Sequence, residues 1–219
     1  MPKKNPKKTD CVFCKKENIN EGIIYEDKNF IIKVGFAIIA AGHVMIIPKK
    51  HYSCFGAMPV NLLKEYDKLK TKLIKEIETK FSRPILIEYG VWGQSINHAH
   101  MHFIPKSSAG YKIKNIISEI KRCHPGFKIK YKKIKKIEYL KKIYEKEKEY
   151  VLIERKKRIY IFSTKNIGEK RNSCLDYRIL FTKKGIKGVK NWRKLTKKEK
   201  IADNYKRHLT KTVLDFDDF

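Results

Sequence analysis

The stretch that decides the fold is Gly93-Gln94-Ser95-Ile96-Asn97-His98-Ala99-His100-Met101-His102-Phe103-Ile104-Pro105. From His98 onward, histidine alternates with small or apolar residues, which is the period of a β-strand. We therefore expect the three imidazoles to share one face and the residues between them to point into the core. Such a row favours either a metal site or a nucleophile held between two partners over a purely structural role.

The small polar loop before this row, residues 93–97, is suited to anion binding. Its backbone N–H groups and the Ser95 hydroxyl are placed to face an anion bound over the histidines. An ordinary turn serine is the simpler alternative for Ser95.

Short apolar runs of strand length surround the histidine row, at residues 23–26, 30–33, 36–39, 43–47, 85–89 and 100–104. Between Asn61 and Phe81 the apolar residues recur at helical spacing, and Asn61 is a suitable N-cap. A set of strands around one long helix predicts an α+β fold.

The chain divides near the small-residue loop at 106–110. We expect a basic tail over residues 1–10, one domain over 11–110 and a basic extension over 111–219. Within the extension the pattern predicts helices at 113–120 and 134–144. It also predicts a strand pair, 150–153 and 158–162, around the basic turn Arg155-Lys156-Lys157.

The net charge of the chain is +29, and most of the excess falls in the second half. A field of that strength attracts polyanions, with nucleic acid and nucleotide phosphates as the obvious partners. Abundant Lys and Ile are also typical of a genome rich in A and T, so the charge by itself leaves both explanations open.

Hydrophobic residues make up 42% of the chain, enough for a buried core, and no apolar run is long enough to span a membrane. Because the first residues lack the apolar segment of a secretion signal, we expect a cytoplasmic protein. In a reducing compartment the five cysteines are metal ligands or plain thiols rather than disulfides.

Three blocks together resemble the histidine triad (HIT) family. They are Cys11-Val12-Phe13-Cys14, then the block from Gly42 to His51, then Gly93-Gln94-Ser95 followed by the histidine row. They stand in the family's order, with the predicted helix between the second and third. The resemblance covers about residues 11–106 and implies a HIT-like antiparallel sheet with a long helix, followed by a basic α/β extension.

The resemblance implies an enzyme that acts at the α-phosphate of a nucleotide through a nucleotidyl-histidine intermediate. His100 corresponds to the family's nucleophile, and His102 and Ser95 are expected to assist it at the phosphate. Substrate contacts are expected from a further set of pocket residues: His43, Gln94, Gly93 and Asn97. A core histidine is the plainer alternative for His43. Family members often form homodimers, so we hold a dimer possible.

Family members with the Cys pair complete a zinc site with two histidines, which here correspond to His51 and His98. Together with Cys11 and Cys14 they would form a closed, structural Zn²⁺ site. A free thiol pair, or Cys54 in place of one histidine, remains an alternative.

The chain departs from the family where many small members carry a carboxylate for the ribose hydroxyls. Residues 35–41 contain none. Asp27 precedes the stretch, with a turn residue as the plainer alternative, and Glu88 is a candidate substitute from a neighbouring strand.

Three functions stay open on the sequence. The first is a nucleotide hydrolase or nucleotidyl transferase. The second is a non-catalytic module that binds nucleotide or nucleic acid. The third is an enzyme acting on adenylated or capped nucleic-acid ends, brought to His100 by residues 111–219. A family-typical extension that only packs against the sheet is the simpler account of that basic half.

Overall fold

The computed structural model describes residues 11–36, 38–92, 94–105, 118, 130–164, 195–214 and 216. The strands within these ranges are β1 (Ile23–Glu26), β2 (Phe30–Val34), β3 (Val44–Pro48), β4 (Pro84–Glu88), β5 (Met101–Pro105), β6 (Tyr131–Ile134), β7 (Tyr150–Arg155) and β8 (Arg158–Ser163). The helices are the 3-10 turns η2 (Val12–Cys14), η3 (Lys16–Asn18), η4 (Asn20–Gly22) and η5 (Phe55–Ala57), and the α-helices α1 (Val60–Lys80), α3 (Tyr139–Glu147) and α5 (Lys197–Val213).

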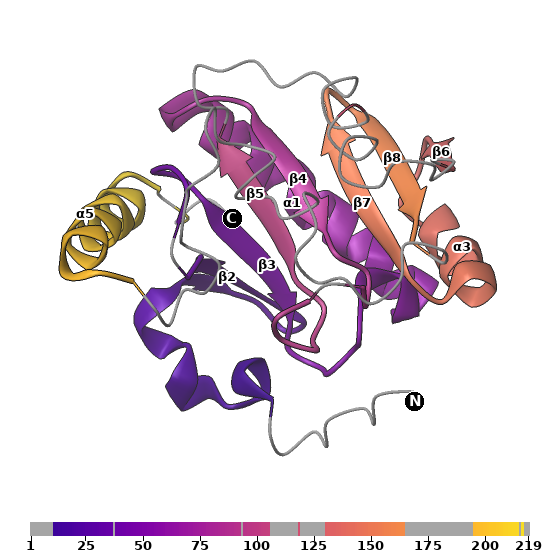
Figure 1. Ribbon diagram of the computed structural model, residues 1–219, viewed down its shortest axis with the longest axis horizontal. Helices are drawn as coiled ribbons and strands as arrows, with labels where there is room; N and C mark the ends of the chain where they lie inside the picture. The colour runs from indigo at the N-terminus through magenta and orange to yellow at the C-terminus, as the bar shows by residue number, and fades with distance from the viewer. Residues whose placement is uncertain are drawn as a thin grey trace.

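The eight described strands form one sheet in the order β1-β2-β3-β5-β4-β7-β8-β6, and neighbouring strands run antiparallel (Figure 1). This confirms the predicted α+β class with an antiparallel sheet. The sheet does not stop at the HIT-like part. Strand β7 pairs with β4, where Leu86 lies opposite Glu154, so the second half of the chain extends the same sheet.

Helix α1 crosses one face of the sheet and supplies much of its core. Its apolar stripe, which includes Leu63, Tyr66 and Leu73, is fully buried against strand residues such as Phe103. The helix begins at Val60 with Pro59 as N-cap, so the predicted cap at Asn61 is wrong. The fixed φ of proline suits the cap position, and the Pro59 carbonyl accepts the Leu63 N–H at 3.1 Å.

Phe36, Ile38 and Ile39 do not form the strand predicted over residues 36–39, since β2 ends at Val34 and β3 begins at Val44, and Ala37 lies outside the described residues. Side chains satisfy the loop's backbone instead of a sheet partner. The Ile38 N–H donates to Asp203 at 2.7 Å, and the Gly35 carbonyl accepts from Arg207 at 2.6 Å. The described residues of this loop are therefore held by side chains of α5.

The strand pair predicted in the extension is confirmed as β7 and β8, joined by a tight turn in which Lys156 and Lys157 have φ values of 49° and 62°. The helix predicted at 134–144 starts later, as α3, because Ile134 pairs with Ile159 at the end of β6. The helix predicted at 113–120 lies outside the described residues, apart from Ser118.

Helix α5 was not anticipated from the sequence, although Thr196 and Glu199 carry the signature of a capping box. The Thr196 side chain accepts the Glu199 N–H, and Glu199 accepts the Thr196 N–H. The helix lies beside β2, and after it Leu214 and Phe216 join the main core (Figure 1). The end of the described chain is therefore packed against its beginning.

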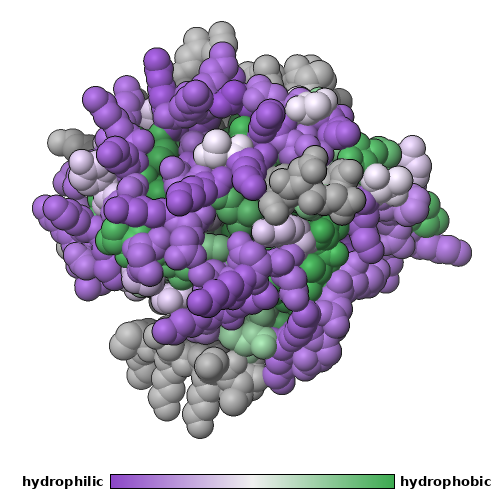
Figure 2. All heavy atoms as spheres, turned by 180° about the vertical axis from the view of Figure 1, so that it is seen from behind, coloured by the Kyte–Doolittle hydropathy of each residue, from purple (hydrophilic) through white to green (hydrophobic). Residues whose placement is uncertain are grey.

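The surface seen from behind is predominantly hydrophilic, with narrow strips of hydrophobic residues between the polar side chains (Figure 2). Among the described residues, none of the helices combines the length and the apolar composition needed to cross a lipid bilayer.

Candidate active site and metal centre

The histidine row lies at the start of β5, on the face of the sheet opposite α1. The strand begins at Met101, so His98 and His100 belong to the irregular segment that leads into it. The strand predicted from His100 therefore starts one residue too early, and before it the Ala99 N–H donates to the Tyr52 carbonyl at 2.7 Å. The rings of His100 and His102 still lie together, with centroids 5.1 Å apart.

His100 has a defined tautomer. Its Nδ1 lies 2.7 Å from the His98 carbonyl, which can only accept, so Nδ1 carries the proton and Nε2 keeps its lone pair. Burial lowers the pKa of His100 below its ordinary value, although the bond to the carbonyl acts in the opposite direction. The ring is therefore neutral near pH 7, with a basic nitrogen free of that bond.

His102 has the opposite arrangement. The Ile39 N–H donates to Nδ1 of His43 at 3.3 Å, so the proton of a neutral His43 sits on Nε2. That nitrogen lies 3.0 Å from Nδ1 of His102 and donates to it. A neutral His102 then carries its own proton on Nε2. Two adjacent imidazoles thus differ in role, since His100 offers a lone pair and His102 offers an N–H.

An aromatic wall that the sequence analysis missed stands beside these histidines. Phe13 contacts His98 and His100 edge-on, with centroids 5.7 and 5.4 Å apart, and stacks against Phe36 at 6.2 Å. The only hint in the sequence is that Phe13 lies between the two cysteines, so fixing the cysteines near His98 also brings the ring to His100.

The polar loop before the row is only partly brought to the site. Gln94 is buried and donates from Nε2 to the Ser53 carbonyl at 2.9 Å, while its Oε1 is buried with no hydrogen-bond partner in the described chain. Ser95 is exposed and Asn97 is half-buried. Gly93 lies outside the described residues.

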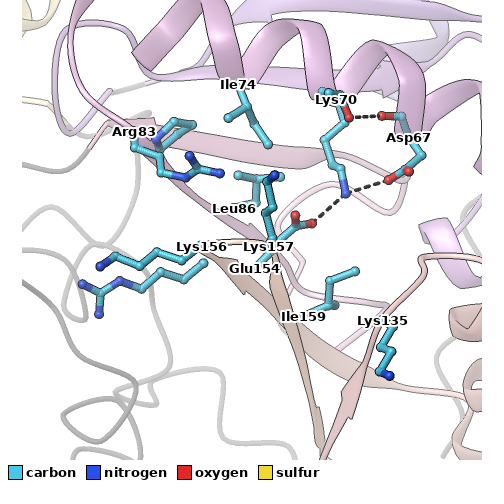
Figure 3. A pocket seen from close by; sticks show the side chains of 13 residues that line it. Asp67, Lys70, Ile74, Arg83, Leu86, Lys135, Glu154, Lys156, Lys157 and Ile159 are labelled. Atoms are coloured by element: carbon cyan, nitrogen blue, oxygen red, sulfur yellow. Dashed lines mark hydrogen bonds and ion pairs between the residues drawn. The ribbon is translucent and has the colours of Figure 1, made fainter. Parts of the chain in front are cut away.

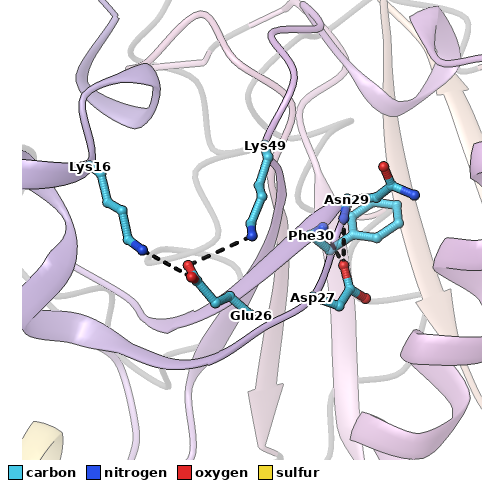
Figure 4. A network of polar contacts seen from close by, with 6 residues as sticks. All are labelled: Lys16, Glu26, Asp27, Asn29, Phe30 and Lys49. Carbon is cyan, nitrogen blue, oxygen red and sulfur yellow. Dashed lines mark hydrogen bonds and ion pairs between the residues drawn. The ribbon is translucent and has the colours of Figure 1, made fainter.

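Both carboxylates considered for ribose recognition serve the fold. Asp27 accepts the N–H groups of Asn29 and Phe30 at 2.7 and 2.6 Å, which shapes the β1–β2 turn (Figure 4). Glu88 is fully buried and accepts from Phe55 N–H and Tyr150 O–H at 2.7 and 2.6 Å. Neither is directed at the histidine row by these contacts.

The four predicted metal ligands converge. The thiol sulfurs of Cys11 and Cys14 and one ring nitrogen each from His51 and His98 lie within 4.8 Å of one another. The nearest sulfur–nitrogen separations are 3.3 Å, from Cys11 to His98 and from Cys14 to His51. Those separations match the edges of a tetrahedron with Zn–S bonds of about 2.3 Å and Zn–N bonds of about 2.0 Å. Cys54 is buried elsewhere, in the core under α1.

The surroundings also fit a metal. His98 donates from Nε2 to the Pro48 carbonyl at 2.7 Å, which leaves Nδ1 with its lone pair directed at the cysteines. Burial lowers the pKa of His98 to about 4, and His51 and His100 add to the effect, so the ligand is neutral. Glu26 holds Lys16 at 2.9 Å and Lys49 at 3.9 Å and so links the segment after the cysteines to the one before His51 (Figure 4).

Comparison with known proteins identifies the family of the chain. A family model described as the HIT domain matches residues 16–109. An uncharacterized HIT-like protein of Methanocaldococcus jannaschii is 32% identical over 101 residues, which cover 44% of this chain and 78% of that protein. The chain belongs to the HIT family.

Other HIT proteins align over the same part of the chain. The protein named hit of Bacillus subtilis is 32% identical over 108 residues, which cover 46% of this chain and 74% of that protein. A solved structure of a hypothetical histidine triad nucleotide-binding protein from Sulfolobus tokodaii is 25% identical, covers 61% of this chain and 88% of its own, and has a TM-score of 0.41. The identity to the Methanocaldococcus jannaschii and Bacillus subtilis proteins confirms the family resemblance expected from the three sequence blocks.

Proposed function

We propose that this HIT protein is a nucleotide hydrolase or nucleotidyl transferase that acts at the α-phosphate. The single observation that carries the proposal is the pair of opposite tautomers, with a lone pair on Nε2 of His100 and a proton on Nε2 of His102. Displacement at a phosphoryl group requires a nucleophile and a nearby hydrogen-bond donor. The rings of His100 and His102 supply both, with centroids 5.1 Å apart.

In the first step Nε2 of His100 attacks the α-phosphorus. A P–N bond forms while the bond from phosphorus to the leaving group breaks, and the leaving group departs with the electron pair and takes up a proton. His102 donates to a phosphoryl oxygen as negative charge develops, with Ser95 and the N–H groups of residues 93–97 as further proposed donors. In the second step water or another acceptor attacks the phosphorus, the P–N bond breaks, and His100 recovers its lone pair.

The nucleoside part is proposed to lie against the aromatic wall of Phe13 and Phe36, near His43, Gln94 and Asn97. Two basic side chains lie near this wall, and the carboxylate of Asp203 reaches the same loop, where it accepts the Ile38 N–H. Buried Lys33 lies 4.2 Å above the Phe36 ring, and Arg207 holds the Gly35 carbonyl.

Zn²⁺ is the proposed cofactor of the cluster formed by Cys11, Cys14, His51 and His98. With four protein ligands it would cross-link the N-terminal segment to the histidine row rather than take part in the reaction. This chain's own contribution is to hold His98, whose carbonyl fixes the His100 tautomer. A cytoplasmic location, where the thiols stay reduced, is part of the proposal.

Substitution of the nucleophile tests the reaction. We expect His100→Asn to abolish turnover of AMP phosphoramidates, diadenosine polyphosphates and adenylated or capped oligonucleotides, because amide nitrogen is not nucleophilic. Nucleotide affinity should change by no more than a few fold. Persistent turnover in His100→Asn would show that the nucleophile lies elsewhere.

Metal analysis tests the second site. Purified protein should contain about one zinc per chain, and Cys11→Ala should lose it together with part of the stability. Cys54→Ala, a buried cysteine outside the cluster, is the matched control and should keep the metal. Equal zinc in Cys11→Ala and wild type would contradict the assignment.

The competing function is a non-catalytic module that holds nucleotide in the HIT pocket and nucleic acid along residues 111–219. This function would be favoured if zinc-loaded wild-type protein binds nucleotide but turns over none of the substrates in the panel. Association of two chains is also part of the proposal and would show in the mass of the protein in solution.

A further inference from the structure

A second cavity lies on the face of the sheet that carries α1. It has a volume of about 300 Å³ and opens between the C-terminal half of α1 and the β7–β8 hairpin (Figure 3). Its floor is a row of register partners, Leu86, Glu154 and Ile159. Leu86 pairs with core residue Phe103, whereas the next residue, Ile87, pairs with His102. The cavity and the histidine row are therefore on opposite faces of the sheet.

The walls of this cavity are mostly cationic. Six basic side chains line it, from α1, the loop before β4, the segment after β6 and the β7–β8 hairpin: Lys70, Arg83, Lys135, Arg155, Lys156 and Lys157. The acidic side chains are Asp67 and Glu154. Positive groups therefore outnumber negative ones three to one.

Both carboxylates contact one lysine, which offsets one of their two negative charges. Lys70 contacts Asp67 at 2.7 Å and Glu154 at 2.9 Å, and this cluster lies at one end of the cavity, away from Arg83 and Lys156 (Figure 3). Burial lowers the pKa of Lys70, but Glu154 and Asp67 together raise it above the ordinary value. The cluster of Lys70, Asp67 and Glu154 therefore carries a net charge of about −1, which the five other cations of the cavity exceed.

Four of those other cations have no acidic partner among the residues that the structure describes. The ion pairs in that part of the chain do not include Lys135, Arg155, Lys156 or Lys157, and Arg83 pairs only with exposed Glu78 at the end of α1. Like charges gathered around a concavity repel one another unless an anion enters. Guanidinium and ammonium groups together suit phosphate.

The hairpin turn supplies an independent observation. Both of its central residues are lysines in the left-handed region, with φ values of 49° and 62°. Turns of this kind favour Asn-Gly, and a left-handed conformation costs a lysine about 1 kcal/mol. Turn formation therefore does not account for Lys156 and Lys157, whereas an anion contact does.

We propose that this cavity binds the phosphate backbone of a single-stranded nucleic acid. Its volume suits one or two phosphate-sugar units of a flexible strand, and the exposed lysines of the turn extend the contact along the strand. Because the site faces away from His102, it anchors the strand independently of the nucleotide reaction. The inference does not rest on that reaction.

The test replaces the turn lysines with the residues that the turn prefers, Lys156→Asn together with Lys157→Gly. This removes two charges without disturbing the hairpin, so thermal stability should be unchanged or higher. Binding of a fluorescein-labelled single-stranded 20-mer is measured by anisotropy across a salt series. We expect affinity at low salt to fall about five- to tenfold, and the slope of log K against log salt to shrink by about 1.4.

The matched control is Lys197→Ala with Lys198→Ala, two adjacent exposed lysines at the start of α5. It removes the same charge away from the cavity and should cost less than twofold. Equal losses in the two variants, or no oligonucleotide binding by wild type, would overturn the proposal. So would inorganic pyrophosphate competing as well as unlabelled oligonucleotide at equal phosphate, which would show that the site takes a small anion.

Discussion

At the scale of single residues, buried polar groups in this protein are held by contacts from elements far away in sequence. Glu88 is the clearest case, because its carboxylate accepts from the Phe55 N–H and from Tyr150, which lies 62 residues further on. Tyr150 in turn accepts the Gly56 N–H at 2.9 Å. This network fastens η5, which precedes α1, to the centre of the sheet.

The protonation of Glu88 predicts a pH dependence of stability. Burial raises the pKa of Glu88 from 4.5 to about 7, against the lowering effect of its two hydrogen bonds. The folded protein therefore holds a proton that the unfolded chain releases above pH 4.5. The free energy of unfolding should fall between pH 4.5 and 7, by as much as about 3 kcal/mol.

Substitution of this carboxyl isolates the effect. Glu88→Gln keeps an acceptor for Phe55 and cannot ionise, so denaturant unfolding at pH 5 and pH 7.5 should differ less than in wild type. Exposed Glu17→Gln serves as the control and should keep the wild-type difference. A wild-type pH dependence in Glu88→Gln would refute the assignment.

At the scale of elements, α5 acts on the site through a loop. It binds the β2–β3 loop with several side chains, among them Asp203 and Thr210, whose Oγ1 accepts the Gly42 N–H at 2.8 Å. The same loop provides the Ile39 N–H that sets the tautomer of His43. The helix at the end of the described chain therefore helps to define which nitrogen of His102 carries a proton.

A pair of threonines tests this coupling. Thr210→Val keeps the shape of the side chain but leaves the Gly42 N–H unsatisfied, which should cost about 1–3 kcal/mol of stability and lower turnover several fold. Thr212→Val removes a comparable bond to a helix carbonyl at an exposed position, and it should change neither quantity appreciably. If Thr210→Val and Thr212→Val gave the same stability and the same turnover, the coupling between α5 and the site would be ruled out.

At the scale of the whole molecule, one sheet joins both halves of the chain. Strand β4 is interior, between β5 and β7, and the main core combines α1 with residues such as Leu140, Leu152 and Leu214 from the second half. A fragment of residues 1–110 would expose the edge of β4 and leave Glu88 without Tyr150.

We therefore predict that the fragment 1–110 does not fold independently. Its denaturant unfolding should lack the sigmoidal transition of the full chain, and it should bind a hydrophobic dye such as ANS, because much of its apolar core is uncovered. The full chain is the control. Cooperative unfolding of the fragment would mean that its core is sufficient.

The sequence by itself determined what local chemistry encodes. The alternation of histidines, the helical spacing before residue 80 and the order of the three blocks predicted the α+β fold, the family and the metal ligands. Local periodicity carries the strand and helix information within a few residues, whereas His51 and His98 were predicted as metal ligands from the family resemblance. The predicted starts of the helices at Asn61 and Ile134 were less accurate, because capping decides the first boundary and strand pairing decides the second.

Only the tertiary structure decided the rest, since it depends on groups distant in the chain. The sequence predicts a strand where the Ile38 N–H in fact donates to Asp203 of α5. It also offers Glu88 as a ribose ligand, whereas the folded chain hydrogen-bonds that carboxyl to Tyr150 and Phe55. The tautomers of His43 and His102, and the cavity between α1 and the hairpin, likewise arise from pairings across the sheet. Burial and hydrogen-bond partners, which set protonation and charge, are properties of the packed molecule rather than of any segment.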